Sequence, residues 1–270
     1  MPGACGAAWR ARSASGKMMT LLVDIGNTRV KWSLMEGGAL GAFHSLAHHG
    51  DLARLVEDPA WRAMDRPGRV VLCAVLSRER LAPLFAWIDA RWGCAVQFAE
   101  AAPRAHGVIN GYREAWRLGA DRWAALIGAR HTCDGAACIF DCGTALTVDV
   151  LGSDGLHHGG LIVPGLRVMS DALGRHADAL DAVTGALPEG GSLPVLATDT
   201  PGAISWGTLH ATVAFIERMI REVRASLACE ITPLLTGGDA GRVLPWLAPP
   251  CQHRPGLVLQ GLAVMAREAP

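Results

Sequence analysis

Two short stretches of the sequence decide the fold: Leu-Leu-Val-Asp-Ile-Gly-Asn-Thr at residues 21–28 and Cys-Ile-Phe-Asp-Cys-Gly-Thr-Ala at residues 138–145. Each is an apolar run that ends on Asp-x-Gly, and residues that alternate between apolar and polar follow it. Alternation with period two is typical of a half-buried strand, so each stretch predicts a strand–turn–strand hairpin. Asp24 and Asp141 stand at equivalent positions 117 residues apart (141 − 24), which indicates a duplicated domain.

Strands and helices alternate along the rest of the chain, which argues for an α/β fold. The patterns predict further strands at 69–76, 95–98, 160–163 and 231–236, and helices at about 50–64, 80–92, 120–131, 166–178, 200–227 and 257–266. The segment 107–119 is expected to be irregular. We expect a disordered tail at 1–18, a first domain at 19–117 and a second domain at 118–270.

The composition excludes several classes of protein. Half of the 270 residues are hydrophobic and 19% are charged, so the chain can bury a sizeable core. The net charge is zero, which argues against direct binding of nucleic acid. No apolar run reaches the ~18 residues that a membrane helix needs. The eight cysteines lack C-x-x-C spacing, which predicts reduced thiols and a cytoplasmic location.

The two hairpin turns carry residues suited to phosphate. A nucleoside triphosphate needs backbone N–H groups near its oxygens and an acid near its magnesium ion. Asp24 and the Gly26-Asn27 turn offer both, and glycine and asparagine tolerate the positive φ of tight turns. Asp141-Cys-Gly-Thr144 repeats the arrangement, and Gly237-Gly238-Asp239 follows a third strand. The P-loop motif G-x-x-x-x-G-K-[ST] is absent, so the pattern predicts another kind of nucleotide site.

Five motifs in order sharpen this prediction: Asp24–Lys31, Gly119–Arg122, Asp141–Ala145, Gly159–Gly165 and Thr200–Gly207. Over about residues 19–265 the chain resembles the acetate and sugar kinase, Hsp70 and actin superfamily, and within it the type III pantothenate kinases. The resemblance implies two duplicated ribonuclease-H-like (actin-like ATPase) domains with an ATP cleft between them. It also implies phosphorylation of pantothenate to 4′-phosphopantothenate, the first step of coenzyme A biosynthesis. Residues 113–118 lack a proline that family members commonly have, which leaves the path of this loop open.

The resemblance also implies a role for particular residues. Asp121 would be the catalytic base. Asp141 would hold a monovalent cation, K⁺ or NH₄⁺, and Asp24 would hold Mg²⁺ through water. The ATP-binding residues would be Asp24, Ile25, Gly26, Asn27, Thr28, Arg29, Val30, Lys31 and Thr144. The pantothenate-binding residues would be Tyr112, Gly119, Ala120, Asp121, Arg122 and Thr200.

Several of these residues have simpler explanations. Asp121 stands at the start of a predicted helix, where an acid also serves as a cap or a first-turn charge. Arg122 offers a planar fork that suits a substrate carboxylate, or it is a solvated charge. Thr200 precedes Pro201 and is also explained as a helix cap. His157 and His158 are interpreted as surface residues.

The resemblance implies a homodimer as well. The apolar stripe from Ile204 to Ile220 gives one helix more apolar area than a small domain covers, so we expect a second copy to cover it and the dimer to form largely through the second domain. Two alternatives stay open: a kinase of the same fold for a sugar or another small acid, and a nucleotide-binding regulator that assists transcription. The presence of Asp24, Asp121 and Asp141 argues against the regulator, because these residues would serve catalysis.

Overall fold

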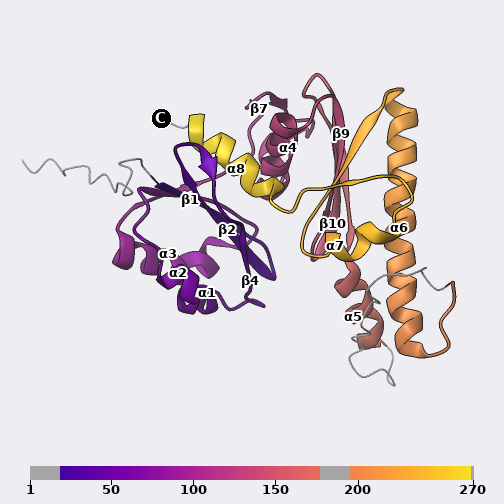
Figure 1. The fold of residues 1–270 in the computed structure, drawn as a ribbon, viewed down its shortest axis with the longest axis horizontal. Coiled ribbons are helices and arrows are strands. Elements are labelled where there is room, and N and C mark those ends of the chain that lie inside the picture. Colours follow the sequence, from indigo (N-terminus) through magenta and orange to yellow (C-terminus); the bar gives the residue numbers. More distant parts are fainter. Residues whose placement is uncertain (1–18, 177–194, 269–270) are drawn as a thin grey trace, which may run out of the picture. The chain divides into compact units, whose positions relative to one another are not determined.

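The computed structural model describes residues 19–176 and 195–268 and is drawn in Figure 1. Within this part, the chain forms two compact units. Unit 1 contains residues 19–101, Trp116–Gly128 and the chain from Val258, and unit 2 contains Ala102–Ala115 and the described residues of Ala129–Leu257. The predicted tail at 1–18 lies outside the described residues.

The sheet of unit 1 has the strand order β3-β2-β1-β5-β6, with β4 also paired to β2. Strand β1 pairs antiparallel with β2 and parallel with β5. The strands are β1 (Met19–Ile25), β2 (Arg29–Glu36), β3 (Ala39–Leu40), β4 (His44–Ala47), β5 (Arg69–Ala74) and β6 (Ala95–Phe98). The first predicted hairpin is therefore confirmed as β1–β2, and β1 is buried along almost its whole length.

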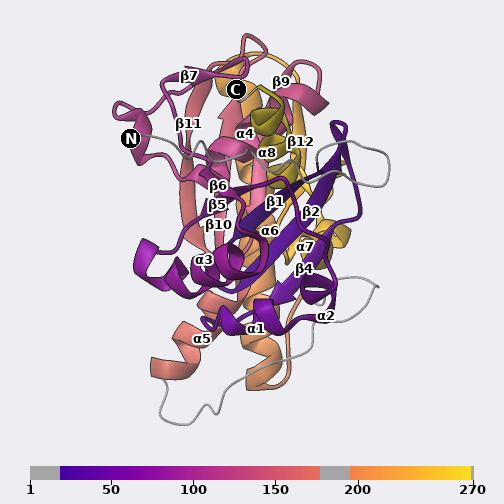
Figure 2. The same cartoon turned by 90° about the vertical axis from the view of Figure 1, so that its left-hand side faces the viewer.

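The helix predicted at about 50–64 is wrong in one respect: the chain forms two short helices, α1 (Ala53–Glu57) and α2 (Pro59–Arg62). Asp58 separates them, since a residue before proline is disfavoured in the helical conformation. Its backbone is extended and its carboxylate accepts hydrogen bonds from the N–H groups of Ala60 and Trp61. The longer α3 (Arg78–Trp92) matches its prediction closely, and Figure 2 shows these helices together with the strands of unit 1.

Two further helices contribute to unit 1, α4 (Ala120–Thr132) and α8 (Leu257–Glu268). They pass so closely that a Cβ atom on Gly261 would lie 1.8 Å from the carbonyl oxygen of Ala124. The contacts thus group α8 and most of α4 with unit 1, whereas the predicted boundary at 117/118 assigned both helices to the second domain. The predicted boundary stays a prediction. Along the chain, α4 runs from unit 1 into unit 2, and α8 begins at Leu257, the last residue of unit 2.

The sheet of unit 2 has the order β11-β10-β9-β12-β13. Its strands are β9 (Ala136–Cys142), β10 (Ala145–Leu151), β11 (His157–Pro164), β12 (Ile231–Thr236) and β13 (Gln252–His253). Strand β9 pairs antiparallel with β10 and parallel with β12, as β1 does with β2 and β5. The repeated hairpin is therefore embedded in the same local topology in both units, as the duplicated pattern predicted.

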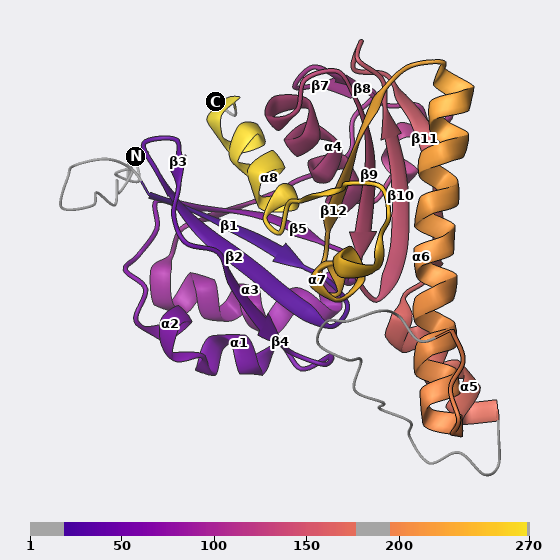
Figure 3. The same ribbon diagram turned by 45° about the vertical axis from the view of Figure 1, so that its right-hand side comes forward.

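The long helix α6 (Thr200–Leu227) lies along one face of this sheet in Figure 3. Its apolar stripe was expected to be covered by a second subunit, and this expectation is wrong. Leu209, Ile216 and Ile220 are buried within unit 2, in one core cluster with Phe140 and Leu235. Because the sheet of the same unit already covers the stripe, it requires no partner.

Shorter elements complete unit 2 and the link between the units. They are α5 (Leu166–His176), α7 (Ala240–Val243), the 3₁₀ turns at Ala115–Arg117 and Leu244–Trp246, and a small ribbon of β7 (Arg104–Ala105) and β8 (Val108–Ile109). The ribbon lies partly in the segment expected to be irregular. Across the described residues, no helix combines the length and the apolar composition that a membrane crossing requires.

Candidate active site

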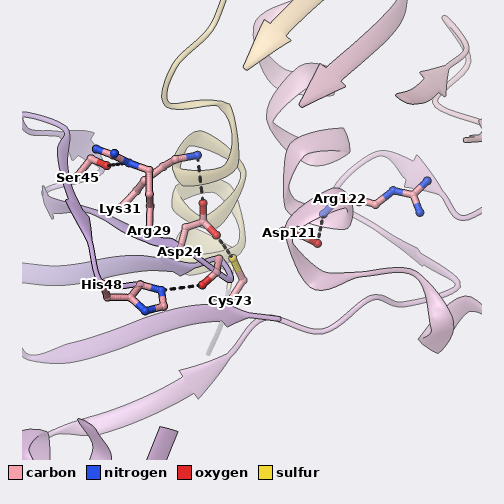
Figure 4. A network of polar contacts seen from close by, with 9 residues as sticks. Asp24, Arg29, Lys31, Ser45, His48, Cys73, Asp121 and Arg122 are labelled. Atoms are coloured by element: carbon pink, nitrogen blue, oxygen red, sulfur yellow. Dashed lines mark hydrogen bonds and ion pairs between the residues drawn. The ribbon is translucent and has the colours of Figure 1, made fainter. Parts of the chain in front are cut away.

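The carboxylate of Asp24 is held in place by the two strands that flank β1. Lys31 stands opposite it on β2, and the Lys31 Nζ atom lies 3.7 Å from Asp24 Oδ2. Cys73 stands beside it on β5, and its Sγ donates to Asp24 Oδ1 at 3.3 Å (Figure 4). Burial, reinforced by the charge of Asp24, raises the pKa of the Cys73 thiol well above its usual value, so the thiol stays protonated as a donor.

The turn after Asp24 is closed by a hydrogen bond from Gly26 N–H to Arg29 O at 3.0 Å. Neither Gly26 nor Asn27 has a positive φ, which corrects the expected reason for these residues. Glycine is favoured at 26 because a Cβ atom there would lie only 3.3 Å from the Arg29 carbonyl oxygen. The imidazole of His48, which the sequence pattern did not single out, also contacts this turn, 3.0 Å from Gly26 O.

Asp121 lies in the first turn of α4, and its Oδ1 accepts a hydrogen bond from Arg122 N–H at 2.8 Å. A Cβ atom on Gly119 would lie 2.6 Å from the same oxygen, so the glycine leaves room for the carboxylate. Burial raises the pKa of Asp121, and the negative charge of Asp24 raises it further, against a smaller lowering from Arg122. Asp24 and Asp121, two carboxylates of the predicted site, thus lie close enough within unit 1 for the charge of one to affect the pKa of the other.

Arg122 is a buried arginine, 6% exposed, whose side chain extends away from Asp24 in Figure 4. An arginine is almost never buried without partners, and Arg122 interacts with other groups of the chain. Its burial argues against the simple explanation as a solvated surface charge.

The second hairpin of the chain is supported by backbone contacts from two other loops. Asp239 N–H donates to Cys142 O at 2.9 Å, and Gly165 N–H donates to Thr144 O at 3.0 Å. A Cβ atom on Gly237 would lie 2.5 Å from Asp141 Oδ1, so Gly237 approaches that carboxylate as only glycine can. The third predicted loop, Gly237-Gly238-Asp239, therefore adjoins the second hairpin directly.

Tyr112 stacks its ring on that of His157, with centroids 5.7 Å apart and planes 18° apart. His157 is fully buried, so its interpretation as a surface residue is wrong. Its Nε2 lies 2.9 Å from Oδ1 of the buried Asp149. Sequence reasoning also missed Asp149, although an acidic residue within the apolar run 145–151 was a signal that could have pointed to a buried polar pair.

Thr200 is the first residue of α6 and is exposed. The helix cap is its neighbour Asp199, whose side chain accepts a hydrogen bond from Gly202 N–H at 2.7 Å. The explanation of Thr200 as a cap is therefore wrong, and its hydroxyl is not used for that purpose. Among the residues that the structure describes, no three His, Cys, Asp or Glu side chains gather as ligands for a metal ion.

The sheets of the two units and their repeated hairpins define the class of the protein by fold: it has the duplicated α/β fold of the actin-like ATPases and sugar kinases. Its fold is similar to that of a protein from Campylobacter jejuni described as a Baf family transcriptional activator, with a TM-score of 0.57 at 19% identity, over 92% of this chain and 98% of that chain. It is also similar to an activator of 2-hydroxyisocaproyl-CoA dehydratase from Clostridium difficile, solved with bound ADPNP (TM-score 0.50, 13% identity, 92% and 94% covered).

Sequence comparison narrows the class to one family. The family model of type III pantothenate kinase matches residues 20–222, and the chain belongs to this family. It is 38% identical over 255 residues to the type III pantothenate kinase of Nitrosococcus oceani, covering 93% of this chain and 94% of that protein. The enzyme of the same name from Alkalilimnicola ehrlichii is 38% identical over 250 residues, covering 92% and 98%.

Proposed function

We propose that this protein transfers the terminal phosphoryl group of ATP to the hydroxyl group of pantothenate, the first step of coenzyme A biosynthesis. Family membership supports the reaction and the substrate. The observation that carries the proposal is the carboxylate of Asp121. It lies in the Gly119–Arg122 motif, in space that Gly119 leaves open, and its pKa is raised by burial and by Asp24.

We assign Asp121 the role of general base. Phosphoryl transfer passes through a loose transition state, so the protein mainly positions groups and balances charge. A carboxylate with a raised pKa is a better proton acceptor for the attacking hydroxyl than an ordinary one. Arg122 would bind the carboxylate of pantothenate through its planar fork, and Tyr112, Gly119, Ala120 and Thr200 would complete the substrate site.

We assign the ATP phosphates to the two hairpin turns, at Asp24–Lys31 and at Asp141–Thr144. ATP brings a divalent metal in kinases, and Mg²⁺ keeps several waters and takes few protein ligands. The buried carboxylate of Asp24 fits an ion held through water, because the described residues form no group of three or more His, Cys, Asp or Glu ligands around it. Lys31, at the edge of the same turn, would neutralise phosphate charge.

We place the monovalent cation, K⁺ or NH₄⁺, beside Asp141. The carboxylate is half-buried, and Asp141 Oδ1 and Cys142 O both lie next to Gly237, within 2.5 Å of where its Cβ atom would be. Oxygen atoms of these two kinds are ligands that such a cation accepts. The cation would balance negative charge near the phosphates.

We also propose a homodimer, on a basis other than the α6 stripe. The outer strand β11 exposes Leu161 and Ile162, the latter by 62%, and the adjoining α5 exposes Leu173 by 51%. Exposed apolar side chains on an edge strand and the helix that follows it favour a second copy as their cover. Sedimentation equilibrium at micromolar concentration tests this, and a monomer there would contradict it. A cytoplasmic location stays a prediction.

A coupled assay of ADP release tests the function. Pantothenate is expected to support turnover, while a panel of sugars and small hydroxy acids is not, and replacing potassium by sodium is expected to lower the rate. Turnover with a sugar instead of pantothenate would favour the alternative of a same-fold kinase for another substrate. ATP binding without turnover on any acceptor would favour the regulator.

A further inference from the structure

The buried side chain of His48 connects the end of β4 to the first hairpin turn. Gly50 N–H donates a hydrogen bond to His48 Nδ1 at 3.0 Å. A backbone N–H is always a donor, so Nδ1 is the acceptor in this arrangement. The ring proton is therefore on Nε2, which lies 3.0 Å from the carbonyl oxygen of Gly26 and donates to it (Figure 4).

The backbone of the same segment holds the other side of the turn. The N–H groups of His48 and His49 both donate to Thr28 O, at 2.9 and 3.2 Å. The carbonyls before and after Asn27-Thr28 are thus both bound by the segment that follows β4. Carbonyl oxygens held in this way cannot turn toward an anionic ligand, which they would repel.

The hydrogen bond to Gly26 O also orients the next amide group. The described chain has no cis peptide bond, so the C=O of Gly26 and the N–H of Asn27 point in opposite directions. Since the Gly26 carbonyl is held toward His48, the N–H of Asn27 points away from His48. This is the orientation that a phosphate-binding amide requires, because backbone N–H groups that point outward from a turn bind anions.

We propose that His48 is a positioning residue of the nucleotide site, which fixes the 26–27 peptide so that Asn27 N–H can bind a phosphate oxygen of ATP. This role rests on the proposed assignment of the first hairpin to ATP. The backbone after His48 supports it independently. His49 has φ +48 and Gly50 has φ +96, and non-glycine residues rarely adopt the first of these. These two consecutive left-handed residues bring Gly50 N–H onto the ring.

Two substitutions at this position separate the two hydrogen bonds of the ring. In His48→Asn, the side-chain oxygen occupies the place of Nδ1 and can still accept from Gly50 N–H, but the amide is too short to reach Gly26 O. In His48→Gln, the longer side chain brings an N–H to the place of Nε2. The control is His44→Asn, at an exposed histidine of β4 that stacks on Trp32 and has no hydrogen bond to the 26–27 turn among those described.

We expect His48→Asn to raise the KM for ATP about three- to tenfold, the range that corresponds to one hydrogen bond. His48→Gln is expected to restore it to within about twofold of the wild type, and the KM for pantothenate should not change in either variant. An unchanged KM for ATP in a folded His48→Asn enzyme, or equal defects in both variants, would overturn the positioning role. Wild-type enzyme without pantothenate-dependent ADP release would overturn the proposed function instead.

A measurement on the wild-type protein covers the case in which neither variant folds. Titration with a non-hydrolysable ATP analogue, followed through backbone amide resonances, should shift the Asn27 amide strongly and slow its hydrogen exchange. An Asn27 amide that the analogue leaves unperturbed while other residues of the hairpin respond would overturn the proposal.

Discussion

The two hairpins share their topology and differ in what supports them. In unit 1, side chains hold the loop: Cys73 and Lys31 hold Asp24, and His48 holds Gly26. In unit 2, backbone groups hold it: Asp239 N–H binds Cys142 O, and glycines approach Asp141 and Gly143. A duplicated fold can thus keep strand order while each copy stabilises its loop by different chemistry. Truncation of a supporting side chain should therefore damage the first hairpin. In the second hairpin, the damaging change should be a Cβ atom added to a supporting glycine.

The largest effect is expected from Asp121→Asn, which tests whether only unit 1 carries the proton-accepting group. Turnover should fall by ~10²–10⁴-fold, the usual contribution of a general base, with little change in ATP binding. The folded pKa of Asp121 is raised, so this group destabilises the fold increasingly as the pH rises from its unfolded to its folded pKa. The cost is complete above the folded pKa and absent below the unfolded one. The Asn variant should therefore melt no lower than the wild type at neutral pH. A variant with normal turnover would end the assignment.

The second prediction breaks the backbone-supported hairpin. Gly237 has φ +95, and an added Cβ atom would lie 2.4 Å from Cys142 O. Gly237→Ala should therefore lower stability by more than the roughly 1 kcal/mol that a left-handed alanine costs, and should weaken ATP binding. Gly135→Ala is the matched control, because Gly135 has φ +79 but nothing within 4 Å of its added Cβ atom. Equal losses of melting temperature in the two variants would show that backbone strain, and not contact with the loop, is the cause.

The third prediction tests the side-chain support of unit 1. Cys73→Ala removes the S–H donor to Asp24 and should raise the KM for ATP a few-fold, as expected for one weak hydrogen bond of about 1 kcal/mol. Cys73→Ser keeps a donor at the same place and should lie closer to the wild type. The KM for ATP is compared among the wild type and the two variants, provided that their melting temperatures agree. Identical KM values in all three proteins would mean that Lys31 alone suffices to hold Asp24.

The smallest effect concerns pH. When the solution is acidified, a general base loses activity as it becomes protonated. Because the pKa of Asp121 is raised, this loss of turnover should begin at a higher pH than it would for an ordinary aspartate. The charge of Asp24 is the second cause of this shift, so Asp24→Asn should move the acidic limb of the residual activity to lower pH. The profile of turnover against pH in the two proteins measures this. A limb that does not move would show that burial alone raises the pKa.

Much of the fold could be predicted because its signals are local. Short apolar runs marked β1 and β9, alternation with period two marked β2 and β10, and the repeated Asp-x-Gly turn marked the duplication. The predictions that failed depended on contacts with distant residues. The stripe of α6 was correctly identified as apolar, yet its cover was assigned to another chain, because periodicity shows that a face is buried and not which element buries it. His157 was expected at the surface and is buried, because its burial likewise depends on residues that the local pattern does not show.

What the sequence determined by itself was the two hairpins, the strands β5, β6, β11 and β12, and the motif residues, because strand period and turn residues depend on neighbours a few positions away. It did not indicate the short strands β3, β4, β7, β8 and β13. Only the tertiary structure decided which side chains support those turns. His48 lies 22 residues from Gly26, and Cys73 lies 49 residues from Asp24, so the pairing follows from the register of β4 on β2 and of β5 on β1. Strand register is specified by packing of the whole sheet against its core, and no local pattern contains it.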